Sequence, residues 1–480
     1  MKSKKLLTIK ATENLKIDQV RSLYKNFYNA GMEKLNGSFG FGEELVKYAE
    51  GINIYTNKRI VKDFTGGSGV LNIGHNHPKI LKLRIAFQKK KKMEVHKTFF
   101  SNYLAGLAYN ISSILPGNLW NSFFCNSGAE AVDGALKLAY KYFNGKRKYV
   151  LYSDISFHGK LIGAGSVTAA NNSTSEDKSF NFQKFPNTIK FIYNDIQNVE
   201  NIVKRYKKKN SSESDIYAII IEPFSASRMV AIDENFLIRL NLLCKKNKIL
   251  LIFDEIYTGW FKTGTLFYFM RYNVIPDILT TAKTLGGGKA SISAYISRKE
   301  VFNKAYGNLA DSLLHSTTYS GFAEECATAI ETMNILFDEK FDEKIKIIEK
   351  KISEQNRLLK NKFPETIETI KGYGAHYGIK FKINSPKLKK ILSIIPSKFF
   401  SDKLFLDKLV VTAIIDQLYR KFNILTIFTA NKEVFLWVSP ALVVKEKEIN
   451  FFYKSLESCI KIGLKKIVYK FVKRKLLSLF

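Results

Sequence analysis

Short apolar runs alternate with longer segments of helical periodicity between about residue 66 and residue 335. The sequences KYVLY (148–152), IYAIIIEP (216–223) and ILLIFDE (249–255) hold runs of consecutive apolar positions, whereas 130–143 and 234–247 repeat apolar residues at helical spacing. Strands that are apolar on every position are buried on both faces, and strands that alternate with helices form a parallel sheet covered by those helices. The middle of the chain is therefore predicted to be an α/β domain.

The two ends of the chain have a different pattern. Residues 1 to about 45 are polar with helical spacing, and 47–67 (KYAEGINIYTNKRIVKDFTGG) breaks short strand-like runs with turn residues. After residue 336 the sequence predicts a long amphipathic helix over 339–363, followed by a mixture of helices and strands. The predicted division is an N-terminal segment of a smaller domain (1–65), a large α/β domain (66–335) and the C-terminal part of the smaller α+β domain (336–480).

The charge of the chain fits two explanations. The chain has 76 lysines and arginines against 43 acidic residues, a formal net charge of +33. This suits either a basic surface for nucleic acid or an anionic membrane, or a compositional bias spread over the whole chain. Only 12 of the basic residues are arginine, and the lysines are distributed along the whole sequence. Specific readout of nucleic acid favours arginines gathered in one patch, so no specific nucleic-acid partner is predicted.

Two basic segments leave other partners open. The C-terminal segment 459–480 mixes lysine and arginine with large apolar residues, which suits a helix docked on its own domain or a helix on an anionic membrane surface. Lys89 to Lys92 form a run of four lysines, which suits a solvated helix end or a docking site for an acidic carrier protein. The docked helix and the solvated helix end are the simpler interpretations.

Cysteine usage and the N-terminus indicate the compartment. The four cysteines are far apart and form no CxxC pair, so neither a disulfide framework nor a metal site is predicted. The N-terminus lacks the apolar core of a signal peptide, and no run approaches the roughly 18 apolar residues of a membrane-spanning helix. A cytoplasmic protein is predicted.

Two segments carry ionisable residues suited to bind a ligand, and one of them stands at a predicted strand end. Asp254 follows directly on the apolar run 249–253, at the carboxyl edge of the sheet where ligands of open α/β folds bind. Lys283 stands between small residues and the glycines 286–288, which allow tight turns and close backbone approach. Partial burial would lower the pKa of the Lys283 amine and favour the nucleophilic form that a Schiff base requires.

Two other segments are weaker signals on their own. Ser127, Gly128 and Ala129 open the predicted helix, where backbone N–H groups and the serine hydroxyl suit an anion, although an ordinary N-cap uses the same residue types. Phe157 and His158, in the sequence SFHG, suit either stacking on a planar ring or ordinary packing.

Together and in this order, these segments resemble the class III aminotransferases, a subgroup of the fold-type I pyridoxal-phosphate enzymes. The resemblance runs from about residue 45 to about residue 455 and includes GSGVLNIGHNHPKI, NSGAEAVDGALKLA, SFHG, IIIEP, LLIFDEIYTGWFKTGTLF, PDILTTAKTLGGG and HSTTYSG. It implies a large domain with a mainly parallel sheet and a smaller α+β domain built from both termini. It also implies pyridoxal 5′-phosphate (PLP) as cofactor and a homodimer with shared active sites.

The resemblance implies a role for each candidate residue. Lys283 would hold the cofactor as a Schiff base and later carry a proton between substrate and cofactor, while Asp254 would pair with the pyridine nitrogen. Phe157 and Ile256 would pack on the two faces of the ring, and His158 would orient the loop behind Phe157. The remaining cofactor-binding candidates are Ser127, Gly128 and Ala129 at the phosphate, Thr318 at the phosphate of the neighbouring subunit, Glu222 in the sequence IIIEP, and Tyr257 at the ring hydroxyl.

Two departures from the family concern the substrate. Many members carry Gln-Gly-Glu-Gly after the Glu-Pro pair, whereas here Ser227 stands at the position of the usual glutamate. Trp437 replaces the arginine that typically grips an α-carboxylate, and an indole offers an apolar wall instead of paired hydrogen bonds. One hypothesis is a pocket of apolar or aromatic character for an aldehyde/amine pair without an α-carboxylate. The other is that Arg228 takes over the carboxylate.

The predicted activity is the transfer of an amino group from an amine or amino-acid donor to an aldehyde or keto acceptor, in two half-reactions. An aminomutase of the glutamate-semialdehyde type, which returns the amine to the same carbon skeleton, is the alternative within enzymes. A basic nucleic-acid- or membrane-binding protein on an enzyme-like fold would leave Lys283 and Asp254 without a role, which disfavours it. The apolar stretch from about 390 to 415 suits a longer substrate channel or local packing.

Overall fold

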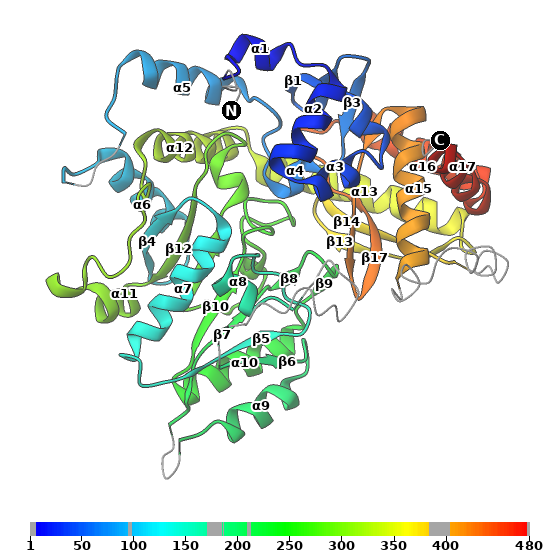
Figure 1. Cartoon of the computed structure of the whole chain (residues 1–480). Helices are drawn as coiled ribbons and strands as arrows, with labels where there is room; N and C mark the ends of the chain where they lie inside the picture. The colour runs from blue at the N-terminus through cyan, green and yellow to red at the C-terminus, as the bar shows by residue number, and fades with distance from the viewer. Residues whose placement is uncertain are drawn as a thin grey trace.

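The structure of the chain is a computed structural model that describes residues 6–94, 98–169, 185, 187–208, 213–383 and 404–477. Figure 1 shows two regions. The lower region holds a large sheet and its covering helices, coloured cyan to green. In the second region, blue N-terminal segments lie beside orange and red C-terminal segments.

The larger region is built on a seven-stranded sheet in the order β4-β12-β11-β10-β7-β5-β6. The pairs β11-β10, β10-β7, β7-β5 and β5-β6 are parallel, and β12 pairs antiparallel with both of its neighbours. The mainly parallel sheet predicted from the sequence is therefore confirmed. Its strands are β4 (Leu119–Cys125), β12 (Ser293–Arg298), β11 (Ile278–Thr281), β10 (Leu250–Asp254), β7 (Ile216–Ile221), β5 (Tyr149–Ser153) and β6 (Thr188–Phe191).

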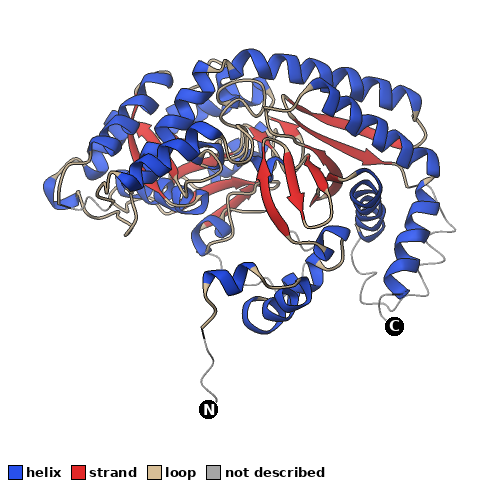
Figure 2. Ribbon diagram, turned by 90° about the horizontal axis from the view of Figure 1, so that it is seen from above, coloured by secondary structure: helices blue, strands red, loops and turns tan. Residues whose placement is uncertain are grey.

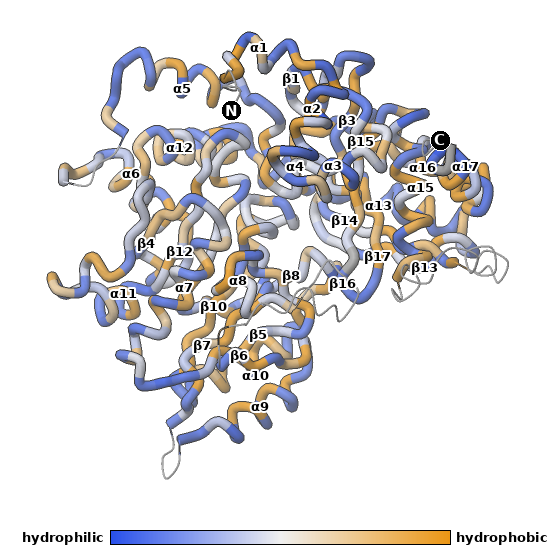
Figure 3. The backbone as a smooth tube through the Cα atoms, in the orientation of Figure 1, coloured by the Kyte–Doolittle hydropathy of each residue, from blue (hydrophilic) through white to orange (hydrophobic). Residues whose placement is uncertain are grey.

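Alternate residues of the central strands enter two different cores. On β7, Ile219 and Ile221 belong to one buried cluster, and Ala218 and Ile220 belong to the other. Because successive side chains of a strand point to opposite faces, both faces of the sheet are buried, which explains the consecutive apolar positions in the sequence. Figure 3 shows hydrophobic colours along β7 and β10 in the interior of this region.

Helices cover the two faces of this sheet. α7 (Gly128–Tyr142), α8 (Ile162–Ser166) and α11 (Lys299–Tyr306) contribute to one core. The other core contains residues of α6 (Asn102–Ile114), α9 (Ile196–Arg205), α10 (Glu234–Asn247) and α12 (Ala323–Asp338). Figure 2, which views the molecule from above, shows helices packed around the strands of this region.

The second region holds two four-stranded sheets, one of which joins the two ends of the chain. β15 (Ile424–Leu425) pairs parallel with β3 (Ile60–Asp63), so a strand near the C-terminus completes a sheet that starts with β1 (Val46–Glu50) and β2 (Asn53–Thr56). The other sheet has the order β13-β14-β17-β16. Its strands are β13 (Ile367–Tyr373), β14 (His376–Phe381), β17 (Glu433–Val438) and β16 (Phe428–Asn431). The domain boundaries near residues 65 and 335 stay a prediction.

Helices from both ends of the chain complete this region. The amphipathic helix predicted over 339–363 is α13. Of the apolar stretch near 390–415, residues up to 403 lie outside the described part and the remainder belongs to α15. The C-terminal helices are α13 (Phe341–Lys362), α15 (Phe405–Phe422), α16 (Glu446–Ile462) and α17 (Leu464–Leu477), and the shorter N-terminal helices are α1 (Ile9–Glu13), α2 (Ile17–Leu23), the π-helix η1 (Tyr24–Tyr28), α3 (Ala30–Asn36) and the 3₁₀ helix η2 (Gly40–Glu43).

The basic C-terminal helix α17 is docked on α15. Its residues Ile467, Val468 and Phe471 are buried, and the two helices are in contact. This burial removes the apolar face that a helix needs to lie in a membrane surface, so the structure agrees with the docked interpretation. The four lysines 89–92 are exposed at the end of α5 (Pro78–Lys89). Among the described residues, no helix is long and apolar enough to span a bilayer.

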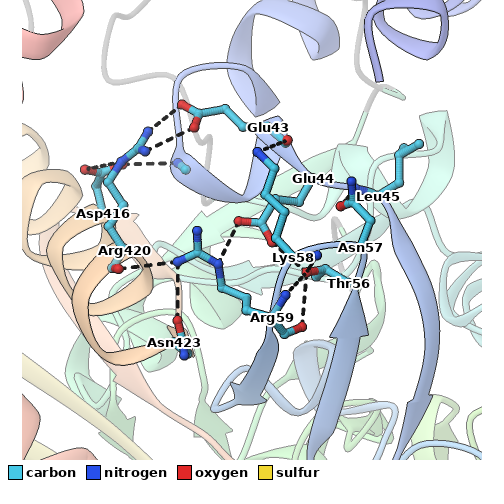
Figure 4. A network of polar contacts seen from close by, with 11 residues as sticks. Glu43, Glu44, Leu45, Thr56, Asn57, Lys58, Arg59, Asp416, Arg420 and Asn423 are labelled. Carbon is cyan, nitrogen blue, oxygen red and sulfur yellow. Dashed lines mark hydrogen bonds and ion pairs between the residues drawn. The ribbon is translucent and has the colours of Figure 1, made fainter. Parts of the chain in front are cut away.

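A buried carboxylate ties α17 to the N-terminal segment. Asp416 of α15 has no exposed side-chain surface, and it accepts hydrogen bonds from the Gly40 N–H (3.1 Å), from Arg420 Nε (3.1 Å) and from Arg474 of α17. Arg420 also pairs with Glu43, as Figure 4 shows. The segment before β1 and the last described helix are thus both held on α15.

Candidate active site

The ends of three adjacent strands bring the main candidates together. Glu222 follows β7, Asp254 is the last residue of β10, and Lys283 lies two residues after β11. These strands are parallel neighbours, so their carboxyl ends lie at one edge of the sheet, where α/β folds bind ligands. Asp254 thus lies at the carboxyl end of a buried strand, as the sequence predicts, and the structure brings Glu222 and Lys283 to the same edge.

The chain reverses at Lys283. Lys283 and Gly287 both have a positive φ, of 51° and 58°. A Cβ atom at Gly287 would come within 2.4 Å of Thr332 Oγ1, so this glycine is required by space as well as by conformation. Thr284 Oγ1 donates a hydrogen bond of 2.8 Å to the Gly69 carbonyl, which anchors the turn against the start of the large domain.

The charges at this edge act on one another. Burial lowers the pKa of the Lys283 amine, and the nearby carboxyl groups of Asp254 and Glu222 oppose that effect. Burial raises the pKa of Glu222 well above its usual range, and repulsion from Asp254 adds to the increase. Burial thus raises the pKa of Glu222, and it makes the Lys283 amine easier to deprotonate than a solvated lysine.

His158 orients Asp254 rather than merely supporting Phe157. The buried imidazole places Nδ1 2.7 Å from Asp254 Oδ2, and the other carboxylate oxygen accepts the Ile256 N–H at 3.0 Å. The Phe157 N–H donates to Glu222 Oε2 at 2.9 Å. The segment SFHG, which two residues separate from β5, is thus hydrogen-bonded to the ends of β7 and β10.

The start of α7 lies against the same edge. Ser127 is an exposed N-cap whose hydroxyl accepts the Glu130 N–H, and the Glu130 carboxylate accepts the N–H groups of Asn126 and Ser127. The N–H groups of the first two helical residues, Gly128 and Ala129, have no intrahelical acceptor and point toward the helix N-terminus. A Cβ at Gly128 would come within 2.9 Å of Ile256 Cδ1, so the predicted phosphate segment and the predicted ring contact Ile256 are in direct contact.

Thr318 lies on an exposed loop. Its neighbour Thr317 accepts a weak hydrogen bond of 3.5 Å from Asn126 Nδ2, beside the start of α7. The Thr318 side chain is exposed in the single chain, a position from which it can contact another subunit.

An aromatic cluster lies beside Lys283. Lys283 Nζ is 5.1 Å from the centroid of the Tyr257 ring, and the Trp437 ring meets Tyr257 edge to face with centroids 5.6 Å apart. Tyr257 Oη lies 2.8 Å from His376 Nδ1 and 2.9 Å from Ser439 Oγ. The resemblance to the family suggested the Tyr257 hydroxyl as a contact to the cofactor. In the structure this hydroxyl is already hydrogen-bonded to protein groups.

Sequence reasoning did not select His376 or Ser439 as site residues. His376 lies on β14 and Ser439 directly follows β17, far from Tyr257 in the sequence. Neither residue stands in a pattern that indicates chemistry, so no sequence signal would have identified them. Arg228, a candidate for carboxylate binding, pairs with Glu433 and also donates to the Asn431 carbonyl at 3.3 Å.

The family Aminotransferase class-III matches residues 44–460 of this chain. The chain belongs to the class III aminotransferases. A putrescine aminotransferase of Pectobacterium atrosepticum is 32% identical over 374 residues, which cover 76% of this chain and 77% of that protein. As an aminotransferase, the chain uses an amine donor and a carbonyl acceptor.

Solved transaminases share the fold. A transaminase from the marine bacterium Virgibacillus superposes with a TM-score of 0.78 at 19% identity and covers 94% of this chain and 99% of its own. An ornithine aminotransferase of Toxoplasma gondii superposes with a TM-score of 0.75 at 20% identity and covers 97% of each chain. These likenesses confirm the predicted fold-type I architecture.

Class III aminotransferases depend on PLP, and the residues at this edge suit it. The edge offers a buried amine for an aldehyde, a carboxylate held by His158 for a pyridine nitrogen, and a helix N-terminus for a phosphate. His158 Nε2 is buried and has no hydrogen-bond partner among the described residues. The imidazole proton at Nδ1 is thus directed at Asp254 alone.

Proposed function

We propose that this aminotransferase acts on amines and carbonyl acceptors that lack an α-carboxylate, in a pocket with an aromatic wall. The observation that carries the proposal is the pair Tyr257 and Trp437 beside Lys283. The Tyr257 ring lies between Trp437 and the Lys283 amine. Trp437 stands at the position where the family has its carboxylate-binding arginine. An indole there favours contact with apolar substrate atoms.

The surroundings of Trp437 support an apolar pocket. Trp437 belongs to a buried cluster with Phe224, Met229, Tyr268 and Phe435. Phe224 precedes the turn between β8 (Phe224–Ser225) and β9 (Val230–Ala231), where many relatives carry Gln-Gly-Glu-Gly. The segment that replaces Gln-Gly-Glu-Gly thus contributes Phe224 and Ala226 to the cluster of Trp437, and Ser227 is not one of its members.

Arg228 is a poor replacement for the missing arginine. It lies on the β8–β9 turn, and its guanidinium pairs with Glu433, which also pairs with Lys380 at 2.9 Å. To bind a substrate carboxylate, Arg228 would have to give up a partly buried ion pair, which costs free energy. Its charge is therefore better explained as part of the contact between the β8–β9 turn and β17.

The proposed roles of the cofactor-binding residues follow from their positions. Lys283 would bind the PLP aldehyde, Asp254 the pyridine nitrogen, and Ser127, Gly128 and Ala129 the phosphate, with Phe157 and Ile256 on the two ring faces. When bound, PLP supplies an electron-withdrawing ring next to the amine-bearing carbon of the substrate. The Lys283 amine removes the proton from that carbon, and its lowered pKa favours the neutral form needed for this task. Glu222 holds the Phe157 backbone in place, because its Oε2 accepts the Phe157 N–H.

A first experiment tests the roles of Lys283 and PLP. After incubation with PLP and dialysis, the wild-type protein should keep the absorbance band of the bound cofactor, whereas Lys283→Ala should not. Circular dichroism serves as the control for folding. A wild-type protein without the band would contradict the proposal.

A second experiment tests the substrate class. With one amine donor, the kcat/KM for an unbranched aldehyde should exceed that for 2-oxoglutarate by about tenfold or more, as expected when a pocket lacks a partner for a charged group. Trp437→Arg should shift the ratio toward 2-oxoglutarate. Arg228→Met should leave the ratio unchanged; a selective loss of 2-oxoglutarate turnover in this variant would instead assign the carboxylate to Arg228.

Release of a keto or aldehyde product derived from the donor separates a transaminase from an aminomutase. An aminomutase returns the amine to the same carbon skeleton and releases no such product from the donor. Product analysis by mass spectrometry with an isotopically labelled donor decides between the two activities.

We further propose a cytoplasmic homodimer in which Thr318 serves the neighbouring site. Large exposed apolar side chains support an interface near this loop: Phe99, Phe100, Leu309 and Leu313 are between 70% and 106% exposed. Exposed apolar patches mark protein–protein interaction sites. Mixing Lys283→Ala with Thr318→Trp tests the shared site. If Thr318 acts across the interface, the mixed dimer regains one working site, and activity returns where each variant alone is inactive. No recovery in proven mixed dimers would contradict it.

A further inference from the structure

The polar atoms around Tyr257 form a hydrogen-bond network with one direction. His376 Nε2 lies 3.2 Å from the Ala226 carbonyl, while His376 Nδ1 lies 2.8 Å from Tyr257 Oη. A carbonyl oxygen only accepts, so Nε2 carries the imidazole proton and Nδ1 has a free lone pair. Ser439 Oγ lies 3.3 Å from the same Nδ1, so the shorter contact makes Tyr257 the donor to His376. Ser439 then donates to the Tyr257 oxygen at 2.9 Å.

The imidazole of His376 stays neutral in this arrangement. His376 is fully buried, and burial lowers its pKa to about 3, an effect to which the charges of Lys262 and Lys283 contribute. Only a neutral imidazole offers the acceptor that the Tyr257 hydroxyl needs. The direction of the network is thus maintained throughout the pH range in which enzymes work.

The network fixes a ring that lies against the reactive amine. The Tyr257 ring is packed beside Lys283: a Cβ at Gly69, whose φ is 92°, would come within 3.1 Å of Tyr257 Cε2 and 3.2 Å of Lys283 Cδ. On another side the ring meets His376 and Trp437, with centroids 4.6 Å and 5.6 Å away. The Tyr257 hydroxyl is hydrogen-bonded both as donor and as acceptor, so the ring cannot turn away from Lys283 without losing these hydrogen bonds.

We propose that His376 is a positioning residue for Lys283: through the Tyr257 hydroxyl it holds the Tyr257 ring face against the amine and so sustains the amine's basicity. The negative face of an aromatic ring stabilises a cation near its centroid. It therefore acts in the same direction as the carboxyl groups of Asp254 and Glu222, and against the effect of burial. The proposal rests on Lys283 as the reactive amine and is independent of the substrates.

The experiment measures the pKa of Lys283 in the full-length protein freed of PLP. The rate of acetylation of the Lys283 amine by trace acetic anhydride is followed against pH by mass spectrometry. Loss of a cation–π contact should lower this pKa by about 0.4 to 1.5 pH units. We expect this decrease in His376→Leu and in Tyr257→Phe, and no further decrease in the double variant, because both changes remove the same hydrogen bond.

Two variants serve as controls. His376→Gln keeps a donor for the Ala226 carbonyl and an acceptor for Tyr257, so it should retain the wild-type pKa of Lys283. Tyr377→Phe removes a buried hydroxyl, bonded to Ser353 at 2.9 Å, from the residue next to His376, and should also leave that pKa unchanged. If His376→Leu does not fold, Tyr257→Phe alone decides, since it keeps the ring and removes the bond.

A wild-type pKa of Lys283 in the folded single variants would overturn the proposal. The same decrease from His376→Leu in the native and the Tyr257→Phe backgrounds would also overturn it, because His376 would then act without Tyr257. Since the measurement needs neither PLP nor substrate, failure of the proposed function would appear in the absorbance and turnover assays and not here.

Discussion

Replacing Asp416 with asparagine should loosen the C-terminal helix α17 without unfolding the protein. Asp416 Oδ1 accepts hydrogen bonds from Gly40 and Arg420, and Oδ2 accepts from Arg420 and Arg474. Asparagine has one carbonyl oxygen, which can keep the bonds from Gly40 and Arg420. Its amide then presents hydrogens to the Arg474 guanidinium, which loses its acceptor.

The magnitude follows from the bond that is lost. A hydrogen bond to a charged group contributes about 1.5–3 kcal/mol. Arg420 keeps its pair with Glu43, so the loss is concentrated on Arg474, whose side chain is 38% exposed and regains part of its hydration in water. We therefore expect the lower part of this range, about 1.5–2 kcal/mol, for the free energy of local opening of α17.

Hydrogen exchange measured by mass spectrometry reports this opening directly. At 1.4 kcal/mol per factor of ten, the amides of α17 should exchange about 10- to 30-fold faster in Asp416→Asn than in the wild type. Glu457→Gln is the matched control. Glu457 pairs with Lys362 and Lys461, whose side chains are 52% and 59% exposed, and such surface pairs contribute little. Exchange of α17 within a factor of two of the wild type would refute the reasoning.

Two other predictions concern the active-site edge. Because burial raises the pKa of Glu222 and its Oε2 accepts the Phe157 N–H, a role that an amide oxygen can also fill, Glu222→Gln should keep most of the kcat. Asp254→Asn should lower the kcat by about 100-fold or more, the scale of losing a preorganised charge; comparable losses in the two variants would contradict this distinction between the two carboxyl groups. The pKa of His376, about 3 in the folded protein, lies below the value of about 6.5 in the unfolded chain. Acidification from pH 7 to pH 5 therefore protonates only the unfolded state, which lowers the free energy of unfolding by about 2 kcal/mol. His376→Gln should lose correspondingly less stability over this range in urea titrations, and an equal loss in both proteins would show that His376 does not titrate as proposed.

Much of the fold and of the cofactor edge could be predicted from the sequence because the signals are local. The consecutive apolar positions of β7 and β10 reflect burial on both faces of a sheet, a property of each strand by itself. The helix over 234–247 and the amphipathic helix near 341–362 likewise match α10 and α13. Asp254 could be placed at the carboxyl edge of the sheet because it directly follows a buried strand. Lys283 was singled out by its glycine run, and the structure puts it at the same edge.

The substrate side of the site was decided by the tertiary structure. Tyr257 meets His376 across 119 residues and Ser439 across 182 residues, and Arg228 meets Glu433 across 205 residues. Such pairs depend on how the sheet of the second region packs against the large sheet, and no periodicity encodes it. The sequence alone therefore left Arg228 open as a carboxylate ligand and Tyr257 as a cofactor contact, until packing supplied each of them with a protein partner.

The sequence by itself determined where the chain is buried, where it turns, and that the carboxylate of Asp254 stands at the end of a buried strand. Only the tertiary structure decided which polar groups are already satisfied by one another, and hence which remain for a substrate. The physical reason is that a burial pattern can be recognised from residues close together in the sequence, whereas hydrogen bonds and ion pairs between distant segments form only once those segments pack together.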